Sequence, residues 1–345
     1  MTDFELYMHR CLQLARLGEY YVAPNPMVGA VLVEDGCGKA IDAETADSRI
    51  LGEGWHMQYG GPHAEPNCLR NAEEKHNNEI DYKRCTLYVS LEPCSHYGKT
   101  PPCAELIIQK GIGRVVIGCL DPNPRVAGRG VKMMQDAGIE VVVGVLEEDC
   151  RELNKRFICL QEKKRPYVVL KWAQTADGFI DIKRTGGSPL VISTPIMKQL
   201  VHEQRAKNMA IMVGTNTVLL DNPRLLTTHW SGRNPIRITL DRHGVLPENS
   251  KIFSNEAETI VYQENTDWEY ILADLGKQNI HSVLVEGGSI LLNHILGTGL
   301  YDEVHVEVGN REIGQGVDGV KAPEYAFRTA PKQIDGHRVY IEKKR

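Results

Sequence analysis

The sequence lacks any long apolar run and any excess of positive charge. No segment approaches the roughly 18 apolar residues needed to span a bilayer. The first residues, Met1 to Glu5, show neither the basic region nor the apolar stretch of a signal peptide. The formal net charge of -5 argues against a protein whose main role is to bind nucleic acid. We therefore expect a cytoplasmic protein with neither nucleic acid nor membrane as a partner, which still leaves room for a basic pocket that takes a phosphorylated small molecule.

Cysteine is absent from the second half of the chain. All nine cysteines lie between Cys11 and Cys159, in odd number and without a disulfide-rich spacing, which fits a reducing compartment. At 345 residues the chain is too long for one ordinary core, so two domains are expected. The uneven distribution of cysteine indicates that these two domains have different chemistry.

Both halves of the chain alternate between strand-like and helix-like segments, which predicts an α/β fold. In the first half we expect strands at 28–33, 51–56, 86–91, 114–118 and 139–143, helices at 3–18, 102–110 and 130–137, a helix that starts near 63, and a polar loop at 35–50. In the second half we expect strands at 167–173, 210–214, 236–241, 259–262, 282–286 and 303–308, and helices at 195–206, 267–278 and 288–297. One charged helix at 147–164 is expected to close the first domain. The predicted domains are 1–150 and 166–345, joined by 151–165.

His63, Cys94 and Cys103 have the composition of a catalytic zinc site, in which three protein ligands leave one position for water. Each is expected at a helix start, where the helix dipole favours a thiolate. Glu65 is expected to move protons between water, a ring nitrogen and leaving ammonia. This set is the signature of deaminases that use one zinc ion to replace an amino group of a heterocycle by oxygen.

The spacing of Cys94 and Cys103 is unusual, because eight residues separate them instead of two. The alternative interpretation is that both are ordinary buried cysteines and that His63 is a hydrogen-bonded loop residue. The combination of His-Ala-Glu upstream with Pro-Cys downstream, each after a strand and before a helix, favours catalytic zinc. The other seven cysteines are expected to be packing or surface residues.

The segment Pro93-Cys94-Ser95-His96-Tyr97-Gly98-Lys99-Thr100-Pro101-Pro102-Cys103 closely resembles the deaminase half of the bifunctional riboflavin-biosynthesis enzymes. Those enzymes join a diaminohydroxyphosphoribosylaminopyrimidine deaminase to a 5-amino-6-(5-phosphoribosylamino)uracil reductase. Segments 24–29, 61–65 and 121–124 are similar to the same family, and the resemblance covers essentially the whole chain. It implies a cytidine-deaminase-like three-layer domain whose pocket is lined by Asn25, His56 and Lys99.

The second half alone indicates only an α/β domain that binds a nucleotide. Its best clue is a strand that ends in Glu286-Gly287-Gly288 before a helix, where backbone amides can receive a phosphate, although an ordinary strand-to-helix turn would look the same. The family resemblance implies a dihydrofolate-reductase-like domain that uses NADPH. It implies cofactor contacts by Ala173, Thr217, Asp221, Gly287, Gly288 and Ser289, and substrate contacts by Lys171, Ser188, Arg205, Leu225 and Glu286.

Two departures from the family pattern concern the reductase pocket. The tryptophan expected shortly after Ser188 is absent, and an extra residue follows. No basic residue is found at 225–228, where one is expected near the substrate phosphate. Arg224, His229 and Arg233 are left as candidates for that role.

The resemblance thus implies riboflavin biosynthesis by a homo-oligomer, dimer or tetramer, acting on phosphoribosylated pyrimidines. The expected steps are zinc-dependent deamination of 2,5-diamino-6-(5-phosphoribosylamino)pyrimidin-4-one and NADPH reduction of 5-amino-6-(5-phosphoribosylamino)uracil. Two other interpretations remain open. A nucleic-acid deaminase would need a basic face and would leave the second half unexplained. A structural zinc beside a nucleotide-binding regulator would need a fourth protein ligand and no Glu65.

Overall fold

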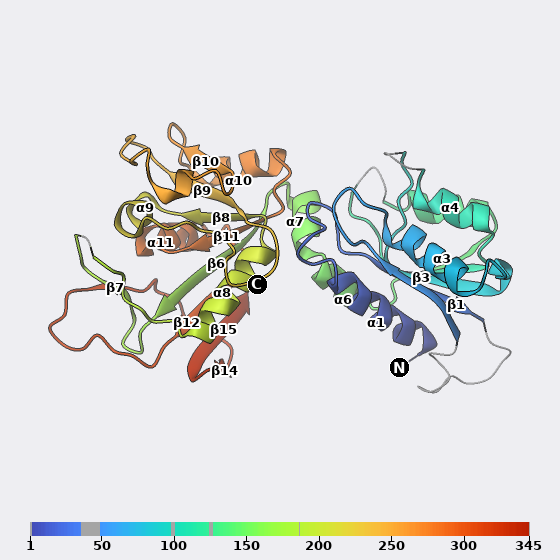
Figure 1. The fold of residues 1–345 in the computed structure, drawn as a ribbon, viewed down its shortest axis with the longest axis horizontal. Coiled ribbons are helices and arrows are strands. Elements are labelled where there is room, and N and C mark those ends of the chain that lie inside the picture. The colour runs from blue at the N-terminus through green and yellow to red at the C-terminus, as the bar shows by residue number, and fades with distance from the viewer. Residues whose placement is uncertain (1, 36–48, 98–100, 124–126, 186, 345) are drawn as a thin grey trace. The chain divides into compact units, whose positions relative to one another are not determined.

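The computed structural model describes residues 2–35, 49–97, 101–123, 127–185 and 187–344, which divide into two compact units, Met1–Glu162 and Lys163–Arg345 (Figure 1). The division falls inside the segment 151–165 that the sequence assigns to a connection. Most of the loop expected at 35–50 lies outside the described residues, as does Lys99. Within the described part of the chain, no helix is long and apolar enough to cross a membrane.

The N-terminal unit is a five-stranded sheet with strand order β2-β1-β3-β4-β5, in which β1 is antiparallel to both neighbours and the rest are parallel. Its strands are β1 (Gly29–Glu34), β2 (Ile50–Trp55), β3 (Cys85–Leu91), β4 (Arg114–Cys119) and β5 (Glu140–Val143). Its helices are α1 (Asp3–Arg16), α3 (Ala64–Lys75), α4 (Cys103–Lys110), α5 (Arg129–Asp136), α6 (Glu147–Leu153) and α7 (Lys155–Lys163), with a 3-10 turn at Tyr82–Arg84.

Helices cover both faces of this sheet and make three layers (Figure 1). Successive residues of β1 point to opposite faces, so Ala30 and Leu32 pack with α3, α4 and α5, whereas Val31 and Val33 pack with α1 and α6. The helix α3 lies very close to β2. A Cβ atom on Gly54 would lie 2.2 Å from the backbone nitrogen of Cys68, so only glycine fits there. This close packing fixes where α3 begins, immediately after His63.

The single helix expected at 147–164 is wrong, because the structure has two helices, α6 and α7, separated at Asn154. The side chain of Asn154 is turned to the loop before β1. Its Oδ1 accepts a hydrogen bond from the backbone N–H of Met27 at 2.8 Å, and its Nδ2 donates to the Met27 carbonyl at 2.9 Å. The break between α6 and α7 is thus the point at which this segment is hydrogen-bonded to the loop before β1.

The C-terminal unit is an eight-stranded sheet with strand order β10-β9-β8-β11-β6-β12-β15-β14, beside a two-stranded sheet of β13 and β7. Neighbours from β10 to β12 are parallel, and β15 is antiparallel to β12 and β14. The strands are β6 (Tyr167–Gln174), β7 (Phe179–Ile182), β8 (Ala210–Val213), β9 (Ile236–Leu240), β10 (Thr259–Tyr262), β11 (Ser282–Glu286), β12 (Glu303–Val308), β13 (Gly319–Lys321), β14 (Lys332–Ile334) and β15 (His337–Lys343). The helices are α8 (Pro195–Lys207), α9 (Thr215–Asp221), α10 (Trp268–Lys277) and α11 (Ser289–Thr298), with a 3-10 turn at Lys251–Phe253.

The two faces of the large sheet have different partners. Leu170 and Trp172 of β6 pack in a core with α10 and α11, whereas Lys171 and Ala173 point to the opposite face. In the pairing register, Lys171 lies beside Glu286 of β11, and Ala173 lies beside Glu307 of β12. The polar residues of β6, β11 and β12 therefore share one face, at the carboxyl ends of parallel strands, where α/β sheets commonly bind ligands.

Candidate active sites

One imidazole and two thiols meet in the N-terminal unit. The ligand atoms of His63, Cys94 and Cys103 all lie within 4.8 Å of one another, and in the described part of the chain this is the one such group suited to a metal ion. The Nδ1 atom of His63 lies 3.6 Å from the Cys94 sulfur and 3.4 Å from the Cys103 sulfur. His63 caps α3 and Cys103 is the first residue of α4, as the sequence predicts. The expectation of a helix start is wrong for Cys94, which lies in the segment between β3 and α4. The donor set fits zinc with one coordination position left open.

The charges of this cluster suit a metal ligand set. Hydrogen bonds from the Cys103 thiol and from His63 lower the pKa of the Cys94 thiol to about 4, and the backbone N–H of Cys103 donates to the same sulfur at 3.2 Å. The hydrogen bond with Cys94 raises the pKa of His63 to about 9. These contacts favour the thiolate form of Cys94, and thiolate is the form of cysteine that ligates zinc.

Glu65 lies in the first turn of α3 beside the ligands and is 3% exposed. Burial raises its pKa above the ordinary carboxyl value, and the neighbouring His63 partly offsets this effect. Glu65, His63 and Cys94 line a cavity of about 240 Å³. A buried carboxyl group with a raised pKa, next to a metal ligand set, is suited to carrying a proton during the reaction.

Asn25 and His56 lie on the wall of the same cavity. The Nδ1 atom of His56 lies 2.9 Å from the Pro62 carbonyl, which can only accept, so this nitrogen carries the proton. The other ring nitrogen, Nε2, then accepts from the Asn25 side-chain amide at 3.0 Å. Burial lowers the pKa of His56, in agreement with a neutral ring. One N–H of Asn25 is thereby committed, and its side-chain carbonyl is the acceptor that Asn25 offers to a ligand.

Several residues of this cavity were not predicted from the sequence. They are His96, Glu92, Asp121, Asn123 and Phe157. Glu92 is 4% exposed and accepts hydrogen bonds from the backbone N–H groups of Gly128 at 2.9 Å and Gly130 at 3.0 Å, which holds the segment after β4 against the site. Burial and the charge of Glu92 raise the pKa of Asp121 to about 6. Asp121 and Asn123 belong to segment 121–124, one of the segments that carry the family resemblance. Their spacing in the sequence did not indicate that they line a cavity together with residues far away in the chain.

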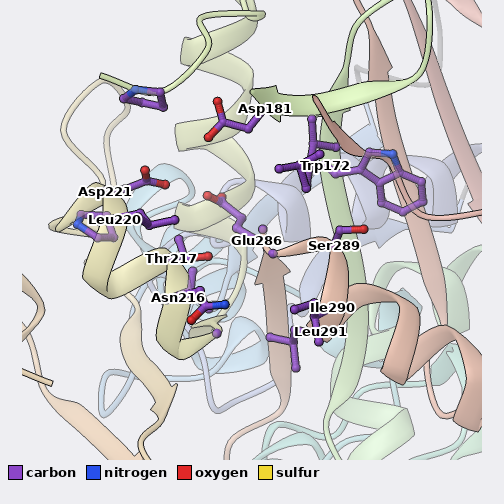
Figure 2. Close-up of a pocket in the computed structure, with 18 of the residues that line it drawn as sticks. Trp172, Asp181, Asn216, Thr217, Leu220, Asp221, Glu286, Ser289, Ile290 and Leu291 are labelled. Atoms are coloured by element: carbon purple, nitrogen blue, oxygen red, sulfur yellow. The ribbon is translucent and has the colours of Figure 1, made fainter. Parts of the chain in front are cut away.

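The C-terminal unit holds a larger cavity of about 760 Å³ at the carboxyl ends of β6, β8, β9 and β11. Ten of the eleven residues predicted for the reductase pocket line it: Lys171, Ala173, Arg205, Thr217, Asp221, Leu225, Glu286, Gly287, Gly288 and Ser289. Ser188 is exposed and lies next to the lining residue Pro189. Figure 2 shows how Asn216 and Thr217, Glu286 and Ser289 converge from α9, the end of β11 and the start of α11.

Gly287 and Gly288 make the turn from β11 into α11. Both have positive φ, +88° and +75°, which side chains other than glycine rarely adopt. A Cβ atom on Gly288 would lie 3.4 Å from the Thr217 hydroxyl, inside the cavity. The turn therefore presents bare backbone to the cavity at a helix N-terminus, an arrangement that favours a phosphate group.

Two of the arginine side chains that line the cavity are paired with carboxylates. Arg205 is paired with Glu286, while Arg184, which the sequence did not suggest, is paired with Asp181 and Asp221. Arg242 also lines the cavity, at the end of β9, and its guanidinium donates to the Thr266 hydroxyl. Arg184 and Arg242 become visible only once the sheet brings distant strand ends together.

The three candidates for the missing phosphate ligand lie elsewhere. Arg224 is paired with Glu256, and the His229 ring packs edge-on against His202 with centroids 4.7 Å apart. None of Arg224, His229 and Arg233 is among the described residues that line the cavity. The basic side chains that do line the cavity are Lys171, Arg184, Arg205 and Arg242, with His294.

Comparison with known proteins covers both units. Residues 1–119 match the cytidine and deoxycytidylate deaminase zinc-binding region, and residues 166–331 match the RibD C-terminal domain. Riboflavin biosynthesis protein RibD of Aquifex aeolicus is 37% identical over 95% of this chain and 94% of its own length, and that of Escherichia coli is 35% identical over 94% and 95%. The chain belongs to the RibD family. It spans nearly the full length of these RibD relatives.

Solved structures of the RibD family agree with this assignment. The diaminohydroxyphosphoribosylaminopyrimidine deaminase/5-amino-6-(5-phosphoribosylamino)uracil reductase of Thermotoga maritima aligns with a TM-score of 0.83 at 38% identity, covering 98% of each chain. Acinetobacter baumannii RibD aligns with a TM-score of 0.84 at 31% identity, covering 99% of each chain.

RibD membership makes this chain a bifunctional deaminase and reductase of riboflavin biosynthesis, with a zinc-binding deaminase domain followed by an NADPH-dependent reductase domain. The predicted α/β fold class is confirmed. A nucleic-acid deaminase or a nucleotide-binding regulator would not account for a match that runs through both halves.

Proposed function

We propose that the two cavities catalyse consecutive steps on phosphoribosylated pyrimidines. The N-terminal site deaminates 2,5-diamino-6-(5-phosphoribosylamino)pyrimidin-4-one, and the C-terminal site reduces the resulting 5-amino-6-(5-phosphoribosylamino)uracil to its ribitylamino form. One observation carries the proposal: most of the residues predicted for each step gather at a separate cavity, one beside a zinc ligand set and one with a glycine turn. The Thermotoga relative is named for the same two activities.

In the deaminase site, His63, Cys94 and Cys103 would hold the metal. Zinc, when bound there, supplies a Lewis acid that lowers the pKa of a coordinated water molecule. Glu65 takes one proton from the attacking water and passes it to the ring nitrogen, and it then passes the second proton of that water to the amino group, which leaves as ammonia while the ring C=O forms. Asn25, fixed by His56, offers its carbonyl oxygen to an N–H of the pyrimidine.

In the reductase site, the chain binds and orients two ligands, and NADPH, when bound, supplies the hydride. The glycine turn at Gly287 and Gly288 receives a phosphate of the cofactor. Lys171 and Glu286 are neighbours in the β6–β11 ladder and face the sugar of the substrate. Arg205 holds Glu286 in place, and the basic residues that line the cavity balance the charge of the substrate phosphate.

Two separate assays test the two halves. Zinc-loaded protein supplied with the diaminopyrimidinone substrate and no NADPH is expected to release ammonia. The same protein supplied with the deaminated compound and NADPH is expected to oxidise NADPH at a rate that depends on that compound. Absence of ammonia release from zinc-loaded protein would contradict the first assignment, and absence of NADPH oxidation would contradict the second.

The proposal also places the enzyme in the cytoplasm as a homo-oligomer. The cytoplasmic location is supported by the cysteines, because no disulfide joins the eight that lie in the described part of the chain, as expected for a reducing compartment. Analytical ultracentrifugation gives the oligomeric state directly, and a monomer at micromolar concentration would contradict the homo-oligomer.

A further inference from the structure

A buried carboxylate–imidazole pair lies directly behind one wall residue of the reductase cavity. Ser193 lines the cavity and donates its hydroxyl proton to Oε2 of Glu307 at 2.6 Å. The other carboxylate oxygen, Oε1, lies 2.7 Å from Nδ1 of His337. The side chains of Glu307 and His337 are 2% and 8% exposed. The three residues come from the segment before α8, from β12 and from β15, so the sheet assembles them.

These hydrogen bonds fix the direction in which the Ser193 hydroxyl group donates its proton. A carboxylate can only accept hydrogen bonds, so the single proton of Ser193 is committed to Glu307. The remaining lone pairs of the oxygen make Ser193 an acceptor toward the cavity. His337 commits the second oxygen of Glu307, so the carboxylate has little freedom to turn away.

The location is the sheet face that carries predicted contacts of both the substrate and the cofactor. Glu307 lies beside Ala173 in the β12–β6 ladder, and Ala173 lines the cavity together with Lys171. Ser193 is therefore anchored to the sheet face that carries the residues predicted to contact the sugar and the cofactor.

The arrangement does not form a nucleophilic serine. Such a serine needs a histidine that takes its proton, with the carboxylate on the far side of the ring. Here the carboxylate of Glu307 lies between Ser193 and His337, so Ser193 is suited to binding rather than attack.

We propose that Ser193 accepts a hydrogen bond from a donor group of the reductase substrate, and that Glu307 and His337 are positioning residues that hold it in this orientation. The inference rests on the proposed reductase function. The substrate phosphate and the pyrimidine carbonyls offer only acceptors and are disfavoured beside Ser193. Sugar hydroxyls and amino groups are donors and fit.

The test is a double-mutant cycle read by calorimetric binding of 5-amino-6-(5-phosphoribosylamino)uracil. Ser193→Ala should weaken binding about five- to tenfold, the loss of one hydrogen bond, and Ser193→Thr should retain most of it. Glu307→Gln should weaken binding at least as much, because its amide donates to Ser193 and turns the hydroxyl proton into the cavity. In the Ser193→Ala background, Glu307→Gln should change binding by less than about twofold.

Glu303→Gln is the matched control, because Glu303 forms another buried pair with a histidine, His305, on the same face of β12 at 3.1 Å. It should leave substrate affinity unchanged, and all variants should bind NADPH as the wild type does.

Removing the sugar hydroxyls from the ligand identifies the donor group that binds Ser193. If the Ser193→Ala effect disappears with this ligand, the donor is a sugar hydroxyl, and if the effect persists, the donor is an amino group.

Additive effects of Ser193→Ala and Glu307→Gln, or equal losses of NADPH and substrate affinity, would overturn the inference. Ser193→Ala removes only a hydroxyl, so unchanged substrate affinity in this variant would also overturn it, whether or not Glu307→Gln folds. Failure of the wild type to bind or reduce this substrate would instead contradict the proposed function.

Discussion

Arg205 and Glu286 form a bidentate ion pair in the wall of the reductase cavity, with distances of 2.7 Å from Nη2 to Oε2 and 3.1 Å from Nε to Oε1. Their side chains are only 16% and 12% exposed. Burial opposes ionisation of Glu286, but the attraction of Arg205 outweighs it and lowers the pKa of this carboxyl group. Arg205 also donates to the Leu226 carbonyl at 3.1 Å. The pair therefore joins α8, the end of β11 and the segment after α9 at one point of the site.

Removing one partner of this pair is expected to destabilise the C-terminal unit. Glu286→Ala leaves the Arg205 guanidinium buried without its carboxylate, and the free energy of unfolding should fall by about 3–5 kcal/mol. Urea unfolding measures the loss. The double variant Arg205→Ala/Glu286→Ala should lose less than the sum of Arg205→Ala and Glu286→Ala, and a strictly additive loss would contradict a coupled pair.

Glu65→Gln is expected to separate the two activities. The amide keeps the shape of the side chain but cannot carry the proton, so the deamination rate should fall by at least about 100-fold. Zinc content, measured by atomic absorption, should stay at the wild-type value, and the deaminated compound should still be reduced at the wild-type rate. Loss of reduction in a folded, zinc-containing variant would show that the sites are not independent.

Arg242 is expected to contribute to the preference for NADPH over NADH. It lines the cavity with its guanidinium hydrogen-bonded to the Thr266 hydroxyl, whereas Arg184 and Arg205 are neutralised by carboxylates. Its charge is thus available for an anionic group such as the extra phosphate of NADPH. Arg242→Ala should raise the KM for NADPH about tenfold, the loss of one charge-assisted hydrogen bond, and leave the KM for NADH nearly unchanged.

Arg224→Ala is the matched control for Arg242→Ala. Arg224 is paired with Glu256 and is not among the described residues lining the cavity, so neither cofactor should be affected. An equal rise of KM for both cofactors in Arg242→Ala would argue against recognition of the additional phosphate.

Glu342 on β15 is expected to contribute to acid sensitivity. Burial opposes its ionisation, but hydrogen bonds from the backbone N–H groups of Arg328 and Thr329, at 2.7 and 2.8 Å, help to lower its pKa to about 2. Because the folded pKa lies below the unfolded one, the stabilisation is present above the ordinary carboxyl pKa and is lost as pH falls toward 2.

The free energy of unfolding should therefore fall more steeply between about pH 5 and pH 2 in the wild type than in Glu342→Gln. Denaturant titrations over a pH series measure both slopes. Parallel slopes in the two proteins would contradict the role of the Glu342 hydrogen bonds.

The metal ligands could be predicted because each carries a local signal. His63, Cys94 and Cys103 lie where strands give way to helices, and such positions are visible in a linear pattern. The long strands and helices were likewise visible as hydrophobic periodicity. The helix break at Asn154 could not be predicted from periodicity. The side chain at the break is hydrogen-bonded to Met27, 127 residues away, and such a contact leaves no local pattern.

One short strand and the hydrogen-bonded group of Ser193, Glu307 and His337 could not be predicted, because both depend on contacts between segments far apart in the sequence. The strand β7 pairs with β13, far along the chain, and neither β7 nor the seven-residue helix α9 was predicted. Ser193, Glu307 and His337 meet only because β12 pairs with β6 and β15, and no spacing in the sequence encodes that contact. Cavity residues supplied by neighbouring strand ends, such as Arg242, depend on the strand order of the sheet.

The central claim is that one chain performs deamination and then reduction. It is tested most directly by recording ammonia release and NADPH absorbance together, after zinc-loaded protein is mixed with 2,5-diamino-6-(5-phosphoribosylamino)pyrimidin-4-one and NADPH. Ammonia should appear first and NADPH oxidation should follow after a lag. Chelation of zinc should abolish both signals while leaving reduction of the deaminated compound intact. NADPH oxidation without prior ammonia release, or neither signal from zinc-loaded protein, would contradict the account.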